Sequence, residues 1–66
     1  MRLQVDQQAD ALYFRLDDSA VVHSVEAAPD VVLDFNQEDE VVGIEMLKLS
    51  TRSRCVDLSA VSFETK

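Results

Sequence analysis

The chain has 66 residues and a mass of 7.4 kDa. This length suits one domain and excludes a two-domain enzyme, a dinucleotide-binding unit or a repeat array. The 13 Asp and Glu residues outnumber 6 Lys and Arg residues and give a formal net charge of −7. We therefore expect no nucleic-acid partner, because the chain would repel a phosphate backbone, and the charge would suit a basic protein partner.

The chain is expected to fold with little margin, because it lacks the usual supports of small domains. Hydrophobic residues make up 47% of the sequence, which is too high a fraction for a disordered segment. A single Cys55 cannot form an internal disulfide, and no Cys/His cluster could hold a structural zinc ion. We therefore expect no cofactor. The sequence turns polar at Gln4 and has no long apolar run, so we expect no membrane segment and a cytoplasmic location.

Alternation of apolar and polar residues, which is typical of half-buried strands, runs through most of the chain. It occurs at residues 3–5, 12–16, 21–26, 31–35 and 41–47. Short polar segments separate these stretches, and Pro29 with Asp30 suits the middle of a β-turn. The sequence therefore predicts a mainly β domain with about five antiparallel strands in a meander.

The C-terminal part of this single domain has a different pattern. We take residues 1–50 as the core and residues 51–66 as a helical or irregular extension. Asp57 could serve as the N-cap of a short helix or helical turn over residues 57–61. We expect the end of the chain to cover one face of the sheet. The apolar side chains for this are Leu49, Val56, Leu58, Val61 and Phe63.

Several predicted strands carry apolar residues on both faces, as with Tyr13 beside Phe14 and Val32 beside Leu33. One short extension cannot cover two faces. Either the sheet is strongly curled, or a second copy of the chain packs against it, and free strand edges also invite pairing between subunits. We therefore expect a homo-oligomer, with a dimer as its simplest form.

The acidic segment at residues 34–45 is the strongest polar feature. Asp34, Asn36, Glu38, Glu40 and Glu45 fit positions one, three, five, seven and twelve of the calcium-loop pattern. However, Asp39 stands where that loop needs glycine, and the flanking segments look like strands. We favour a solvated hairpin tip. The alternative is a divalent-cation or small-ligand site made by Asp34, Glu38, Asp39, Glu40 and Glu45.

Catalytic function has little support in the sequence. His23 is the only imidazole, and although Ser19, Ser24 and Glu26 lie near it in the chain, no nucleophile-elbow motif is present. A sheet this small also leaves little room for a pocket of several hundred cubic ångströms. We therefore predict a non-enzymatic, self-associating interaction module without a catalytic residue.

Three blocks of the sequence resemble a known family. They read DQQADALYFRL at residues 6–16, EAAPDVVLDF at residues 26–35 and VVGIEML at residues 41–47. In this order and spacing they are similar to the small bacterial and archaeal proteins grouped as domain of unknown function 2283 (DUF2283). The resemblance covers about residues 1 to 50 and implies a compact, mainly β domain with a short helical element and no established activity.

The resemblance also marks individual positions. Those that recur, and that could form a site, are Asp10, Tyr13, Asp34, Gly43 and Glu45. Asp10 would equally suit a turn, and Gly43 a crowded sheet face. Asp30 and Glu40 stand where the family commonly has glycine, and the stretch from Arg52 onward resembles nothing in particular.

Overall fold

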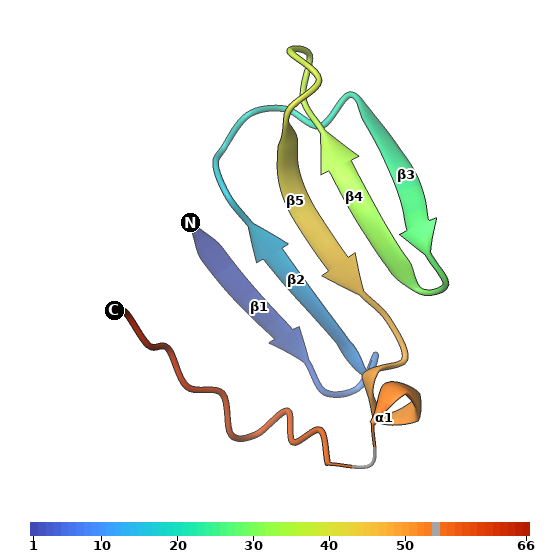
Figure 1. The fold of residues 1–66 in the computed structure, drawn as a ribbon, viewed down its shortest axis with the longest axis vertical. Helices are drawn as coiled ribbons and strands as arrows, with labels where there is room; N and C mark the ends of the chain where they lie inside the picture. The colour runs from blue at the N-terminus through green and yellow to red at the C-terminus, as the bar shows by residue number, and fades with distance from the viewer. Residues whose placement is uncertain (54) are drawn as a thin grey trace.

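The computed structural model describes residues 1–53 and 55–66. Figure 1 shows one five-stranded antiparallel sheet with a short helix beyond one end of it. The elements are β1 (Arg2–Asp6), β2 (Ala11–Arg15), β3 (His23–Ala28), β4 (Val31–Phe35), β5 (Val41–Met46) and α1 (Leu49–Arg52). The predicted fold class, a mainly β domain with five antiparallel strands and a short C-terminal helix, is confirmed.

The strand order, β1-β2-β5-β4-β3, departs from an uninterrupted meander at one connection. Residues 16–22 leave β2 and pass the ends of β5 and β4 before β3 begins, so that β2 pairs with β5 instead of β3 (Figure 1). Strands β2 to β5 therefore form a Greek key. Arg15 holds the connection, because its guanidinium donates hydrogen bonds to the carbonyl oxygens of Asp17 and Ser19.

Asp residues stand at three turns where the backbone is left-handed. The φ angles are 55° at Asp10, 62° at Asp30 and 64° at Asp39. Asp tolerates this conformation better than most residues other than glycine. At Asp30, where the family that the sequence resembles commonly has glycine, the backbone is therefore in a conformation that favours glycine. In the β4–β5 loop, the left-handed residue is Asp39 and not Glu40.

Residues 57–61 form no helix, so of the two predicted forms, a short helix or a helical turn, only the turn is present. Residues 57–60 make a single turn, in which the amide and hydroxyl of Ser59 donate to Asp57 Oδ1 at 3.0 and 2.6 Å. The helix α1 begins earlier because Asp10 caps it: the Asp10 carbonyl accepts the Leu49 amide at 3.0 Å. The Asp10 carboxylate accepts the Ser50 amide at 3.1 Å and the Ser50 hydroxyl at 2.6 Å.

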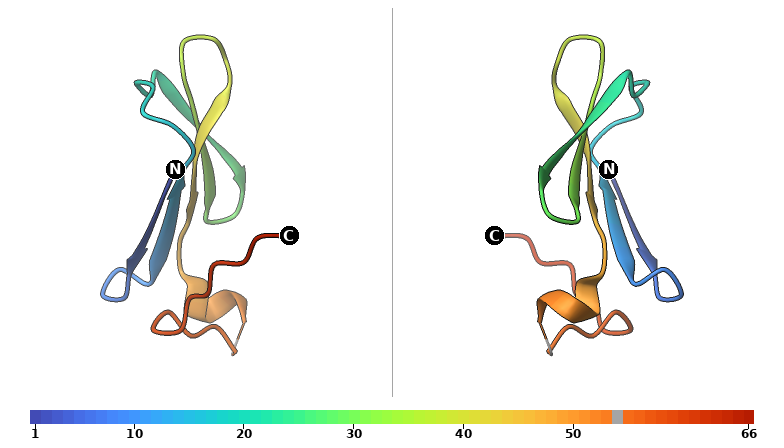
Figure 2. Two further views of the ribbon diagram at one scale, coloured as in Figure 1. Left: turned by 90° about the vertical axis from the view of Figure 1, so that its left-hand side faces the viewer. Right: turned by 90° about the vertical axis from the view of Figure 1, so that its right-hand side faces the viewer.

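The described residues bury little apolar surface. Val42 and Leu49 are the only apolar side chains among them that are fully buried, at 1% and 6% exposure. Leu49 is buried as expected, whereas Val61 and Phe63 stay 49% and 77% exposed. The prediction that these two residues cover the sheet is therefore wrong. Figure 2 shows the C-terminal segment running away from the sheet to one side.

The sheet is a single, twisted layer, as the side views in Figure 2 show. The radius of gyration of the molecule is 12.7 Å, against roughly 11 Å for a compact domain of this length. No helix in the described part of the chain has the length and apolar character needed to span a membrane.

Candidate functional site

The strand register divides the sheet into two faces. Residues directly opposite each other on antiparallel strands point to the same side, and successive residues along a strand point to opposite sides. One face, which we call the apolar face, carries two rows that cross all five strands. The rows are Leu3, Phe14, Ile44, Leu33 and Val25, and beside them Val5, Leu12, Met46, Val31 and Ala28.

The apolar face is open to solvent. None of its ten row side chains is fully buried, and the outermost ones, Leu3 and Val25, are 39% and 46% exposed. Neither row contains a polar side chain. The apolar face is therefore a continuous hydrophobic surface of the kind that marks interaction sites in soluble proteins.

The opposite face, which we call the polar face, carries a hydrogen-bonded network. Tyr13 Oη donates to Asp34 Oδ2 at 2.9 Å, and Ser24 Oγ donates to Asp34 Oδ1 at 2.6 Å. Arg15 Nη1 donates to Tyr13 Oη at 3.1 Å, and this hydrogen bond raises the pKa of Arg15, so its guanidinium stays charged. The network joins β2, β4 and β3 across the surface of β5.

Gly43 of β5 lies beneath this network and leaves space for it. A Cβ atom at this position would lie 2.7 Å from Tyr13 Oη and 3.0 Å from Asp34 Oδ2. Both distances are shorter than van der Waals contact, so a larger residue would displace the two side chains. The interpretation of Gly43 as a residue of a crowded sheet face is confirmed.

An open concavity of about 410 Å³ lies beside the network on the polar face. The expectation that so small a sheet lacks room for a pocket of this size is wrong. Part of its lining comes from outside the strands, from Ala9 in the β1–β2 turn and Leu47 after β5, and strand periodicity does not predict these two positions. The other lining residues are Gln4, Asp6, Ala11, Tyr13, Asp34 and Glu45.

Four of the five positions marked by the family resemblance meet at this place. Tyr13, Asp34 and Glu45 line the concavity, and Gly43 lies under the Tyr13–Asp34 hydrogen bond. Asp10 lies elsewhere, where it holds the start of α1. The sequence reasoning missed the other five lining residues, because nothing in their types or spacing sets them apart from ordinary strand and turn residues. They are Gln4, Asp6, Ala9, Ala11 and Leu47.

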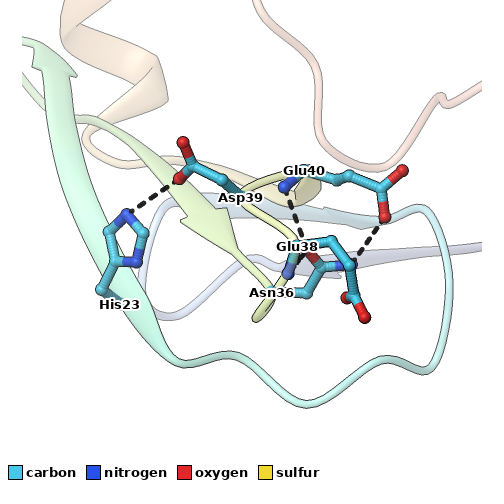
Figure 3. Close-up of polar contacts among 5 residues, drawn as sticks. All are labelled: His23, Asn36, Glu38, Asp39 and Glu40. Atoms are coloured by element: carbon cyan, nitrogen blue, oxygen red, sulfur yellow. Dashed lines mark hydrogen bonds and ion pairs between the residues drawn. The ribbon is translucent and has the colours of Figure 1, made fainter.

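The acidic hairpin tip between β4 and β5 is organised by Asn36 (Figure 3), which is only 3% exposed. Asn36 Oδ1 accepts the amides of Glu38 and Glu40 at 3.1 and 2.9 Å, and Asn36 Nδ2 donates to Glu40 Oε1 at 3.0 Å. These bonds fold the loop backbone around one amide side chain. The Glu38 and Asp39 side chains remain on the exposed outside of the loop.

The five carboxylates of the predicted cation site therefore occupy two places. Asp34 and Glu45 lie on the polar face of the sheet, whereas Glu38, Asp39 and Glu40 lie in the hairpin loop. Within residues 1–53 and 55–66, no three His, Cys, Asp or Glu side chains come close enough to hold a metal ion. The structure does not bring the five together.

His23 also lies apart from the polar network. Its ring stacks on Phe35 with centroids 4.8 Å apart, and its Nε2 is 3.7 Å from Asp39 Oδ1 (Figure 3). Alternation along β3 places Ser24 and Glu26 on the other face of the sheet. The structure therefore separates His23 from two of the three residues that sequence reasoning placed near it.

Comparison with known proteins identifies the chain at the level of its family. No curated protein and no solved structure matches it. Residues 2–50, which comprise all five strands and the start of α1, match the sequence model of the family described as Protein of unknown function (DUF2283). Since this match spans well over half of the chain, the protein belongs to the DUF2283 family.

Proposed function

We propose that the protein is a non-enzymatic module that self-associates, and that two copies pack their apolar faces together into a two-layer sandwich. The observation that carries this proposal is the contrast between ten apolar side chains on one open face and only two fully buried apolar side chains in the described residues. A sheet buries its apolar face against another layer in stable domains, and a second copy of the chain supplies that layer.

The strands set the dimensions of the apolar face. Five strands of 5 or 6 residues, at about 3.3 Å per residue and about 4.8 Å between strands, give a face of roughly 400–500 Å² in plane, against about 800 Å² of accessible surface per partner in a standard interface. The area removed from water would contribute about 25 cal/mol per Å² before the entropic cost of association. The interface between two such faces is therefore small and consists of apolar side chains, which the ten residues of the two rows supply.

The distribution of charge is compatible with pairing two acidic copies. Each chain carries a net charge of −7, which opposes association. The carboxylates of Asp34 and Glu45 lie on the polar face, and those of the hairpin tip lie beyond the strands. In a sandwich of apolar faces these groups point away from the interface or lie at its border.

The exposed free thiol of Cys55 supports a reducing, cytoplasmic environment for the module.

Sedimentation equilibrium at micromolar concentration tests this proposal. The wild-type protein is expected at twice its chain mass of 7.4 kDa. The double variant Leu3→Lys/Val25→Lys is expected to sediment as a single chain, because both side chains are partly exposed in one subunit and would be buried by the second. Val22→Lys is the matched control, since Val22 is 56% exposed and lies outside the strands.

A folded wild-type protein that sediments as a single 7.4 kDa chain throughout the concentration range would overturn the proposal. Circular dichroism of the same samples shows whether the protein is folded. If the double variant unfolds, the wild-type measurement still decides the question. If Val22→Lys dissociates the protein as strongly as the double variant, the interface does not lie on the apolar face.

A further inference from the structure

We propose that the concavity on the polar face binds an alkylguanidinium group, either the side chain of an arginine in a partner protein or a free guanidinium compound. This inference goes beyond self-association and uses the opposite face of the sheet. Both activities can therefore operate in the same molecule, with one concavity on each outer surface of the proposed dimer.

The lining of the concavity has the composition that such a group requires. Its volume of about 410 Å³ lies in the range of small-ligand sites. Ala9, Ala11 and Leu47 give it apolar surface for an alkyl chain, and Tyr13 gives it an aromatic ring. A guanidinium is planar, weakly hydrated and able to stack on aromatic rings, and it pairs with carboxylates through two parallel hydrogen bonds.

Three carboxylates line the concavity, those of Asp6, Asp34 and Glu45. Asp6 accepts a hydrogen bond from the Ala9 amide, and Asp34 accepts two from side chains. Glu45 is therefore the carboxylate left for the incoming cation.

Glu45 lies directly opposite Tyr13 in the β2–β5 register and is half-buried. Within the described part of the chain, its carboxylate takes part in neither a hydrogen bond nor an ion pair. The two ion pairs there join His23 to Asp39 and Lys48 to Asp30. A partly buried, unpaired carboxylate loses hydration, and a bound cation would compensate for that loss.

The Tyr13–Asp34 pair makes one wall of the concavity rigid. Both carboxylate oxygens of Asp34 accept hydrogen bonds, from Tyr13 and from Ser24. Arg15 and Ala11 stand two residues after and two residues before Tyr13 on β2. Arg15 donates a hydrogen bond to Tyr13, and Ala11 lines the concavity. A wall held in place before binding reduces the entropic cost of ordering the site.

The shape of the site, and not acidity alone, distinguishes this proposal from general attraction of cations. The net charge of −7 would draw any cation weakly toward the surface. The carboxylates of the concavity are also too dispersed to form a metal site within the described residues. The experiment must therefore separate a defined position from overall charge.

The probe is N-acetylarginine amide, titrated into ¹⁵N-labelled full-length protein and followed by NMR chemical shifts. Saturable shifts are expected at the amides of Ala11, Tyr13 and Glu45. N-acetyllysine amide is expected to bind more weakly, and N-acetylnorleucine amide, which has no charge, is expected to leave the spectrum unchanged. Glu45→Gln is expected to weaken arginine binding by about tenfold or more, as for loss of a charged hydrogen bond.

Glu38→Gln is the matched control, because it removes the same charge from the exposed hairpin tip. It is expected to leave the affinity for the arginine probe unchanged. Equal weakening by Glu45→Gln and Glu38→Gln would overturn the proposal, since overall charge would then explain the binding. Unsaturable shifts in the wild-type protein would overturn it as well.

A second pair of probes distinguishes the two sources of the guanidinium group. Tighter binding of an acetylated Gly-Arg-Gly peptide than of N-acetylarginine amide supports a protein partner whose main chain also contacts the surface. Equal binding of the two probes supports a free guanidinium compound. Both outcomes support the site. Because the measurement reports shifts at the polar face, it is independent of whether the apolar faces associate.

Discussion

At Gly43, the polar face has no space for a side chain. The substitution Gly43→Ala would place a Cβ atom 2.7 Å from Tyr13 Oη and 3.2 Å from Tyr13 Cζ. Tyr13 cannot move freely, because its hydroxyl is held between Asp34 and Arg15. We predict that Gly43→Ala lowers the free energy of unfolding by about 1–3 kcal/mol, the usual cost of overpacking, as measured by urea denaturation at one fixed protein concentration.

A double-mutant cycle with Tyr13→Phe identifies the cause of this cost. Without the hydroxyl, the closest of the two Tyr13 contacts disappears, so Gly43→Ala should cost less in the Tyr13→Phe background than in the wild type. An equal cost in both backgrounds would show that the strain comes from the backbone of β5 and not from the Tyr13 side chain.

At the scale of elements, the connection between β2 and β3 decides the Greek key, and an Asp–Ser pair orders it. The hydroxyl and amide of Ser19 donate hydrogen bonds that hold the pKa of Asp17 below its ordinary value of 3.8, and the amide lies 2.7 Å from Asp17 Oδ1. The charged form of Asp17 is therefore favoured in the folded connection. Its contribution to stability is fully present above the unfolded-state pKa and is lost as the pH falls through the lower folded-state pKa.

We predict that carbon-detected NMR titration finds the pKa of Asp17 below 3.8 in the wild-type protein. Ser19→Ala removes the hydroxyl and keeps the amide, so it should move the pKa part of the way back toward the ordinary value. An Asp17 pKa unchanged by Ser19→Ala would show that the hydroxyl makes no such bond in solution.

The strands could be predicted from the sequence because their signal is local. Alternation of apolar and polar residues located all five to within about two residues at each end, the usual uncertainty of such boundaries. The order of the strands could not be predicted in the same way, because β2 pairs with β5 across the returning hairpin of β3 and β4. The position of α1 could not be predicted either, because it depends on a contact between residues far apart in the sequence. Asp10, which caps α1, lies 40 residues before its hydrogen-bond partner Ser50.

The candidate site could be predicted only in part. Family resemblance marked Tyr13, Asp34, Gly43 and Glu45, but the concavity results from the register, which places Tyr13 opposite Glu45 and Gly43 opposite Asp34. It also needs Ala9 and Leu47 from outside the strands. The calcium-loop pattern did not indicate an assembled site. Its spacing brings carboxylates together in a loop flanked by helices, but here strands flank the loop. Asp34 and Glu45 therefore lie on the sheet, away from the carboxylates of the hairpin loop.

At the scale of the whole molecule, the single-layer sheet and its open apolar face have one physical consequence. A single layer with two fully buried apolar side chains among its described residues lacks the core from which small domains gain their narrow stability margin. If a second copy supplies the missing layer, folding and association are one equilibrium, and the stability of the protein must depend on its concentration.

We predict that the melting temperature of the wild-type protein rises with protein concentration. For a folded dimer that unfolds to separate chains, a hundredfold increase in concentration stabilises the folded state by about 2.7 kcal/mol per dimer. Thermal circular dichroism across such a range measures the shift directly. Glu45→Gln changes only the polar face and should retain the concentration dependence. Leu3→Lys/Val25→Lys should lower the melting temperature most at high protein concentration, because the wild type gains most from association there. A melting temperature that stays constant for the wild type would show that one chain is stable alone, and the apolar face would then serve a different partner or none.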